Sequence, residues 1–376
     1  TKNLIYFQNK KIKIPHKFLI IKKCINEIKK ITKEKNLDIE FAVDKKNQLQ
    51  ILQVRKLIIP LEKRKLKIDY TMIFNNLEKK INKLKLKQND LYGETTFFGN
   101  MPDWNPAEII GLKPRPLALS LYQELITNHV WSSQRLSYGY KDLSQFRLMT
   151  TFYGTPYIDV RIDFNSWLPI KIDKNISKKL MNYYLTKFKD SENIQDKIEF
   201  EIVFSCITFN TKKRLFNELK NFLNKKEINI FYKCLKHINI RALNEKKKDT
   251  NLIKILEKKQ KNLKRSNLYE IDKIYWAIED CKKFGTLPFA GLARCGFIAI
   301  EILNSLVEIK AISDDDRIKF LSNINIITSD MKCDLLTFKK KDFLNKYGHL
   351  RPGTYDITSP NYRSNFHKYF GKIRKI

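Results

Sequence analysis

The sequence predicts an α+β protein that is mostly helical and has a short β-hairpin near its start. Residues 17–35 repeat apolar side chains every three or four positions, as one face of an amphipathic helix does. Residues 38–43 and 49–55 are short β-branched runs joined by a polar turn, which is typical of two antiparallel strands. Beyond residue 175, apolar stripes of helical period predict helices around 176–189, 209–236, 250–264, 268–283, 289–309, 313–327 and 335–346.

Changes in composition divide the chain into three parts. Residues 61–90 are rich in lysine and have a helical apolar period, which indicates a connecting helix. Residues 93–170 instead gather Gly, Pro, Trp and Arg, as loops and short strands do. We therefore expect a first domain over 1–66, a connecting segment over 67–92 and a mostly helical domain over 93–376.

The net charge is strongly positive. The chain has 376 residues, with 73 Lys and Arg against 40 Asp and Glu, a formal charge of +33. Such a charge attracts polyanions, but most of the cations are lysines, spread along the whole sequence, and no helix-turn-helix, zinc finger or RNP motif accompanies them. We expect a solvated basic surface and no nucleic-acid partner. A non-catalytic module that binds a polyanion is the alternative.

The cysteines and the apolar runs indicate the cellular compartment of the protein. The six cysteines are far apart and form no CxxC pair, so we expect buried free thiols. No uninterrupted apolar run approaches the roughly 18 residues of a membrane helix, and no signal-peptide pattern opens the sequence. These features predict a cytoplasmic protein without membrane contact. The start at Thr1, within an element, predicts that the sequence is part of a longer polypeptide.

The predicted hairpin carries one group of candidate functional residues. Side chains two apart on a strand point the same way, which pairs Asp38 with Glu40 and Gln53 with Arg55. Neighbouring carboxylates suit Mg²⁺, and a guanidinium beside an amide can hold phosphate oxygens. A surface ion pair is the alternative interpretation of these residues.

A second group of candidates lies in the segment YIDVR. If this segment is a strand, Tyr157, Asp159 and Arg161 share one side. A carboxylate beside a guanidinium suits an amino acid, whose ammonium and carboxylate they would bind, and an internal salt bridge is the alternative. In a chain that favours lysine, arginine marks positions where the planar guanidinium is needed; these are Arg115, Arg135, Arg147, Arg294 and Arg351.

The hairpin sequence DIEFAVDKKNQLQILQVRKL resembles the closing hairpin of the ATP-grasp domain in the phosphoenolpyruvate synthase and pyruvate phosphate dikinase family. The resemblance implies that residues 1–66 are the end of an ATP-grasp α/β domain that binds ATP and Mg²⁺. It implies that Glu40 binds metal and nucleotide, beside Asp38, and that Gln53 and Arg55 contact the phosphates. The family's usual Arg-Pro is here Arg55-Lys56.

Residues 98–170, 284–306 and 347–360 resemble the middle domain of the same kinases, particularly the bacterial L-glutamine kinases of capsular phosphoramidate synthesis. Rifampin phosphotransferase is a more distant relative of this architecture. The resemblance implies that ATP transfers its β-phosphoryl group to a histidine, releasing AMP and phosphate. The phosphohistidine would then phosphorylate the amide nitrogen of L-glutamine, the favoured acceptor.

The resemblance also suggests roles for the scattered polar residues. Asp159 and Arg161 would hold the amino-acid end of the acceptor, and the further substrate-binding residues would be Arg115, Arg135, Tyr157 and Arg294. His349 and Arg351, in the segment GHLRPG, would act with Arg55 in catalysis, near the transferred phosphoryl group.

Two parts of such an enzyme are missing from the sequence. We find neither the Thr-Ser-His motif that carries the phosphohistidine nor the glycine-rich phosphate loop of the ATP-grasp domain. The chain is therefore expected to be inactive alone and to dock with ATP-grasp and phosphohistidine domains of the same polypeptide. Fold does not decide the substrate, so pyruvate or an antibiotic remains an alternative acceptor.

Overall fold

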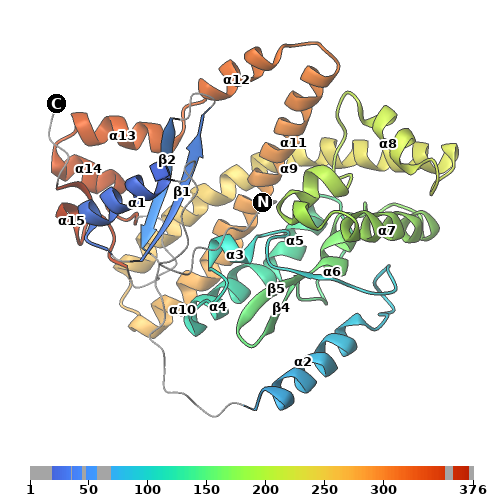
Figure 1. Cartoon of the computed structure of the whole chain (residues 1–376), viewed down its shortest axis with the longest axis horizontal. Coiled ribbons are helices and arrows are strands. Elements are labelled where there is room, and N and C mark those ends of the chain that lie inside the picture. Colours follow the sequence, from blue (N-terminus) through green and yellow to red (C-terminus); the bar gives the residue numbers. More distant parts are fainter. Residues whose placement is uncertain (1–18, 35, 45–47, 57–68, 352–358, 372–376) are drawn as a thin grey trace. The chain divides into compact units, whose positions relative to one another are not determined.

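The fold is mixed α+β and mostly helical, with small antiparallel sheets that include the predicted hairpin (Figure 1). This confirms the predicted class at that level. The computed structural model describes the chain except residues 1–18, 35, 45–47, 57–68, 352–358 and 372–376. The start of the expected connecting segment and part of the stretch 347–360 thus lie outside the described residues.

The chain forms two compact units, and their bounds differ from the expected ones. One unit spans Asp69–Asn323, so it includes the helix that was expected to connect two domains. The other combines the described residues before 68 with those from Ile324 onward. The C-terminal helices therefore belong with the hairpin, and not with the helical domain to which the sequence assigned them.

The hairpin unit contains a two-stranded sheet. Strands β1 (Leu37–Val43) and β2 (Leu49–Lys56) pair antiparallel, with a register irregularity after Glu40. Apolar side chains on both faces of the hairpin are exposed, among them Phe41 and Leu52. The unit's helices are α1 (Leu19–Thr32), α13 (Ile327–Thr337), α14 (Lys340–Tyr347) and α15 (Phe366–Phe370).

The larger unit begins with helix α2 (Tyr70–Lys85) and contains a three-stranded antiparallel sheet in the order β3-β5-β4. The central strand β5 (Thr155–Asp159) lies between β3 (Phe98–Gly99) and β4 (Met149–Phe152). The short helices around this sheet are α3 (Pro106–Ile109), α4 (Pro116–Tyr122), the π-helix η2 (Gln123–Thr127), α5 (Val130–Ser137) and α6 (Val160–Ser166).

The remaining elements of this unit are helical. Helix α9 (Lys225–Arg265) is one continuous element of 41 residues, where the sequence indicated two helices. Its start is fixed by a capping box in which Asn224 and Glu227 satisfy each other's backbone N–H groups. The other elements are α7 (Lys174–Lys189), the 3₁₀ helix η3 (Glu192–Lys197), the π-helix η4 (Ile198–Ile202), α8 (Thr211–Leu219), α10 (Glu270–Asp280), the π-helix η5 (Cys281–Thr286), α11 (Leu287–Glu308) and α12 (Asp314–Ser322).

Helix α11 packs along α9 and against α5. Close approach to α9 depends on Gly291, because a Cβ there would lie 2.6 Å from the Tyr138 hydroxyl and would collide with the carboxylate of Asp249.

The continuous helical stretch Glu270–Glu308 is apolar and long enough to cross a membrane by length and composition alone, a test that core helices of soluble proteins also pass.

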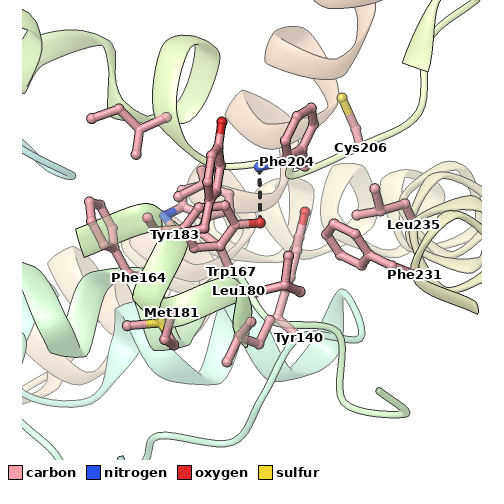
Figure 2. Close-up of a cluster of buried hydrophobic side chains, with 14 of the residues drawn as sticks. Tyr140, Phe164, Trp167, Leu180, Met181, Tyr183, Phe204, Cys206, Phe231 and Leu235 are labelled. Carbon is pink, nitrogen blue, oxygen red and sulfur yellow. Dashed lines mark hydrogen bonds between the residues drawn. The ribbon is translucent and has the colours of Figure 1, made fainter. Parts of the chain in front are cut away.

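The main core of the larger unit is aromatic (Figure 2). The indole of Trp167 meets Tyr140 edge to face at 5.6 Å, and Phe164 meets Tyr184 in the same way at 6.0 Å. The Tyr184 hydroxyl accepts a hydrogen bond from the backbone N–H of Phe204. These contacts hold the indole of Trp167 in a fixed position.

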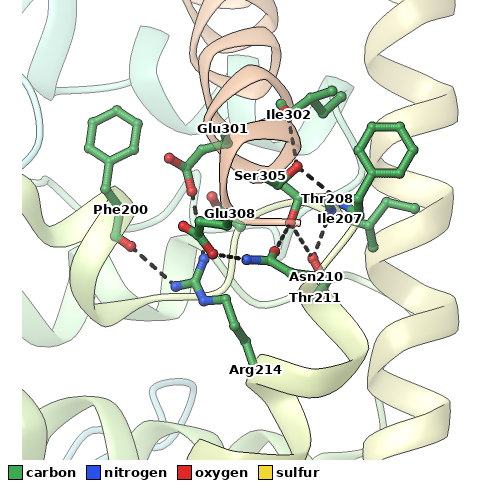
Figure 3. A network of polar contacts seen from close by, with 12 residues as sticks. Phe200, Ile207, Thr208, Asn210, Thr211, Arg214, Glu301, Ile302, Ser305 and Glu308 are labelled. Atoms are coloured by element: carbon green, nitrogen blue, oxygen red, sulfur yellow. Dashed lines mark hydrogen bonds and ion pairs between the residues drawn. The ribbon is translucent and has the colours of Figure 1, made fainter. Parts of the chain in front are cut away.

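A polar network ties the irregular segment after η4 to α11 (Figure 3). Arg214, on α8, donates to the carbonyl oxygen of Phe200 at 3.5 Å and pairs with Glu301 of α11 at 3.8 Å. Asn210 donates to the carboxylate of Glu308. The short helix η4 is thus held beside α11, which matters because both elements line the cavity described below.

Candidate functional site

The hairpin brings its four candidate residues together. Asp38 is opposite Arg55 and Glu40 is opposite Gln53 in the register. Arg55 forms an ion pair with Glu40, and its Nε lies 3.8 Å from a carboxylate oxygen of Asp38. This is the surface ion pair that the sequence left open as an alternative, and the same carboxylates could each supply oxygen ligands to a cation.

The described residues contain no group of three or more His, Cys, Asp and Glu side chains arranged to hold a metal ion. Mg²⁺ commonly keeps several waters and binds through one or two carboxylates together with nucleotide phosphates. Asp38 and Glu40 therefore fit a magnesium ion that arrives with its nucleotide, but they do not form a complete protein cage.

The expectation that Asp159 and Arg161 lie side by side on a strand is wrong. Strand β5 ends at Asp159, whose carboxylate caps helix α6 by accepting from the backbone N–H groups of Arg161 and Ile162. The Thr96 hydroxyl donates to the same oxygen at 2.6 Å. Burial raises the pKa of Asp159, against the effect of these hydrogen bonds. The aspartate thus has the role of an N-cap.

Arg161 has a structural role as well. Its side chain is fully buried, and its guanidinium donates to the carbonyl oxygens of Leu84 at 2.9 Å and Leu86 at 3.0 Å. These carbonyls end helix α2 and have no intrahelical partner. Burial lowers the pKa of Arg161. Both polar residues of YIDVR are thus used within the fold.

The other candidates divide between the two units. Tyr157 is half-buried on β5, where its ring packs 5.3 Å from that of Phe152. Arg115 is exposed at the start of α4, and Arg147 is exposed in a loop. His349 and Arg351 are exposed residues that follow α14 in the hairpin unit.

Arg135 and Arg294 lie together in the wall of a cavity of about 380 Å³ in the larger unit. The cavity falls within the usual range for small-molecule sites. Aromatic and apolar side chains form most of its wall. The lining residues are Met101, Pro102, Asp103, Trp104, Asn105, Glu108, Ile109, Arg135, Trp167, Gln195, Asp196, Ile198, Glu199, Phe200, Phe289, Ala290, Ala293, Arg294 and Phe297.

Both arginines are buried side chains on helices, and both lie near the ring of Trp167. The guanidinium carbon of Arg135, on α5, is 3.7 Å from the ring centroid, and that of Arg294, on α11, is 4.9 Å away. Arg294 also donates to the Ser205 hydroxyl at 2.8 Å. Burial lowers the pKa of Arg294. Rigid helices and a packed indole thus fix both cations.

The carboxylates that pair with these arginines come from irregular segments. Asp103, in the loop before α3, accepts from Arg135 at 2.7 Å. Glu199, on the π-helix η4, forms an ion pair with Arg294. The next residue after Asp103, Trp104, has a φ of 62°, a backbone conformation that costs energy for a large side chain. Its carbonyl oxygen accepts from Tyr122, which helps to hold this loop.

Asp163, on α6, is fully buried. One carboxyl oxygen accepts from the indole N–H of Trp167 at 3.0 Å, and the other has no hydrogen-bond partner among the described residues. Burial, and then the charge of Asp103, raise the pKa of Asp163 well above its usual range, with Arg135 acting in the opposite direction. Asp163 therefore holds the indole of Trp167, on whose ring both arginines lie.

The sequence singled out the two arginines of this cavity but missed its carboxylates and aromatic side chains. Asp103 and Trp104 lie in the segment MPDWNP, whose clustered Trp and Pro signalled a loop with specific shape demands. Phe289 and Arg294 lie in FAGLAR, on one side of α11. Glu199 had no comparable signal, because its segment has the composition of an ordinary helix.

Comparisons of this chain with profiles of known protein families, with curated proteins and with solved structures found no match.

Proposed function

We propose that the chain is the acceptor-binding part of an ATP-dependent phosphotransferase of the phosphoenolpyruvate synthase type, together with the end of its ATP-grasp domain. In this proposal a small acceptor, L-glutamine in the first instance, binds in the Arg135/Arg294 cavity. The phosphoryl group comes from ATP, which binds together with Mg²⁺, and passes through a phosphohistidine on another part of the polypeptide. The proposed location of the polypeptide is the cytoplasm.

The observation that supports the proposal most is the pair of buried arginines in one cavity. Arg135 and Arg294 were expected to bind substrate, and they line the same wall although 159 positions separate them in the numbering (294 − 135). Guanidinium groups bind carboxylates with two parallel hydrogen bonds. Carboxylates on the same wall can accept from an ammonium or amide group. An amino acid presents both kinds of group.

The hairpin supports the nucleotide part of the proposal. Asp38, Glu40 and Arg55 form one charged cluster on the sheet, and carboxylates with a guanidinium are suited to hold Mg²⁺ and phosphates as charge moves between them. His349 and Arg351 belong to the same unit and are exposed, so solvent can reach them for a catalytic role.

A second acceptor class is favoured by one specific observation. Trp104, Phe200, Phe289 and Phe297 line the cavity, and Phe289 and Phe297 are also exposed to solvent. Glutamine has too little apolar surface to cover these rings. An acceptor with a larger apolar body, as an antibiotic has, would cover them. Pyruvate would leave both the rings and the carboxylates without partners.

The test is phosphorus NMR of the complete polypeptide with ATP, Mg²⁺ and L-glutamine. We expect AMP, inorganic phosphate and a phosphoramidate signal that requires glutamine. Arg135→Met should weaken glutamine binding by about tenfold or more, since it removes a buried charged donor. Arg147→Met, at an exposed position outside the cavity, is the matched control. Intact ATP under these conditions would overturn the proposal, and AMP without a glutamine product would reject glutamine as the acceptor.

A further inference from the structure

The charge of the cavity wall is opposite to that of the chain. The whole chain carries +33, yet the charged residues among those that line the cavity are two arginines and four carboxylates. The carboxylates are Asp103, Glu108, Asp196 and Glu199. A wall with a formal charge of −2 (2 − 4) in such a basic protein favours a ligand that brings positive charge.

Two of the four carboxylates are already neutralised inside the protein. Asp103 pairs with Arg135, and Glu199 pairs with Arg294. Glu108 and Asp196 are exposed at the cavity, and neither forms an ion pair with another described residue. The negative charge that remains for a ligand therefore comes from Glu108 and Asp196.

The two arginines are buried within the cavity wall and do not supply its free charge. Arg135 is 5% exposed and Arg294 is 2% exposed, and the Nε atom of each has no hydrogen-bond partner among the described residues. Both nitrogens are enclosed by protein atoms, so the arginines are held inside the wall by Asp103, Glu199 and the ring of Trp167.

The aromatic rings define the rest of the occupant. Trp104 and Phe289 lie 6.5 Å apart, with Phe297 on the same wall. The faces of aromatic rings attract organic cations, and their area favours an apolar body. Carboxylates without partners beside exposed rings form the combination that recognises an alkyl or aryl ammonium group.

We propose that this cavity selects an acceptor with a protonated amine attached to an apolar body, and that Glu108 and Asp196 supply the negative charge for the amine. The inference rests on the proposed function for the identity of the site, and it narrows the acceptor class. Amine-free acids such as pyruvate are excluded by it. Amino acids remain possible, those with a larger apolar side chain above all.

The test uses the chain itself and its tryptophan fluorescence, because Trp104 and Trp167 line the cavity. Three probes share one apolar body: phenethylamine has only the amine, 3-phenylpropionate has only the carboxylate, and L-phenylalanine has both. We expect both amines to bind at least about tenfold more tightly than 3-phenylpropionate. Equal or tighter binding of 3-phenylpropionate, or no binding of any probe, would overturn the inference.

Charge-neutral variants assign the preference to the two carboxylates. Glu108→Gln and Asp196→Asn should each weaken phenethylamine binding by about fivefold, the size expected for a partly exposed ion pair, and should leave 3-phenylpropionate unchanged or slightly improved. Glu78→Gln is the matched control, since it removes the same charge at an exposed position on α2. If the control weakens amine binding as much, general charge explains the effect and the inference fails.

The outcomes separate this inference from the proposed function. Preferential amine binding without phosphorylation of glutamine would leave the inference intact and reject the glutamine kinase activity. Phosphorylation of glutamine together with equal binding of phenethylamine and 3-phenylpropionate would support the glutamine kinase activity and reject the inference.

Discussion

The guanidinium of Arg161 donates to the carbonyl oxygen of Leu84 at 2.9 Å and so closes the end of helix α2. A second bond, to the carbonyl oxygen of Leu86, uses the other terminal nitrogen. The arginine follows Asp159, which caps the start of α6. One short segment thus joins the end of one helix to the beginning of another, and this explains why both residues are buried.

Replacing Arg161 should therefore cost stability. Arg161→Met keeps most of the apolar stem but leaves the carbonyl groups of Leu84 and Leu86 without their charged donor. We expect the free energy of unfolding of the larger unit to fall by about 2–4 kcal/mol, measured by urea denaturation.

Ligand binding distinguishes this role from the substrate-binding role expected for Arg161. At a temperature where Arg161→Met is still folded, binding of L-glutamine should equal that of the unaltered chain. A folded variant with normal stability but without glutamine binding would show that the arginine serves the ligand and not the helix end. Arg147→Met, at an exposed loop position, should change neither quantity.

The sequence predicted the hairpin well and YIDVR poorly, for physical reasons. The β-branched runs over 38–43 and 49–55, joined by a polar turn, predicted two antiparallel strands, and the structure has them. The register irregularity after Glu40 had no signal in the sequence. In YIDVR the change from strand to helix occurs at Asp159. The hydrogen bond from the Thr96 side chain and the packing of α6 decide that change. Neither can be predicted from the five residues of this segment alone.

The cavity was predictable only in part. The scarcity of arginine pointed to Arg135 and Arg294, because a buried planar cation is not replaced well by lysine. Their partners Asp103 and Glu199 lie far from them in the sequence, 32 and 95 positions away (135 − 103 and 294 − 199). Tertiary packing of α5, α11 and η4 brings them together, and no local pattern encodes that packing.

Asp163 should make stability depend on pH. Burial raises its pKa in the folded protein above the unfolded value, so the folded state binds the proton more tightly. Its contribution to stability is therefore present at low pH and is lost as the pH rises from the unfolded pKa, about 3.9, through the folded pKa.

Asp163→Asn removes the titration but keeps an oxygen for the indole N–H of Trp167. We expect the variant to be at least as stable as the unaltered chain at pH 8 and to lose part of the decline in stability between pH 5 and pH 8. Urea midpoints at the two values measure this. A variant that is destabilised equally at both values would show that Asp163 does not titrate in this range.

The Arg294–Glu199 pair should show strong coupling in a double-mutant cycle. The side chain of Arg294 is 1% exposed, so Glu199→Gln leaves a buried cation whose charge is no longer balanced by the Glu199 carboxylate. We expect this change to cost about 2–4 kcal/mol. Arg294→Met combined with Glu199→Gln should cost about 1–3 kcal/mol less than the sum of the single changes. Additive costs, measured by urea denaturation, would mean that the ion pair contributes nothing specific.

Two glycines of α11 provide a matched test of how closely this helix approaches α9. Gly291 faces the hydrogen bond of 2.6 Å between the Tyr138 hydroxyl and Asp249, and a Cβ there would collide with the Asp249 carboxylate. Gly296 has nothing within 4 Å of its Cβ position. Gly291→Ala should therefore destabilise the larger unit by about 1–3 kcal/mol, because the buried pair must move.

Gly296→Ala should instead stabilise the unit by about 0.5–1 kcal/mol, since alanine has the higher helix propensity and meets no neighbour. Thermal denaturation of both variants measures the difference in sign. Because both substitutions add one methyl group to the same helix, helix propensity cancels in the comparison. If Gly291→Ala were also stabilising, the Asp249 carboxylate of α9 could not lie against α11 as closely as it does here, and Arg294, which α11 carries into the cavity wall, would have to shift with the helix.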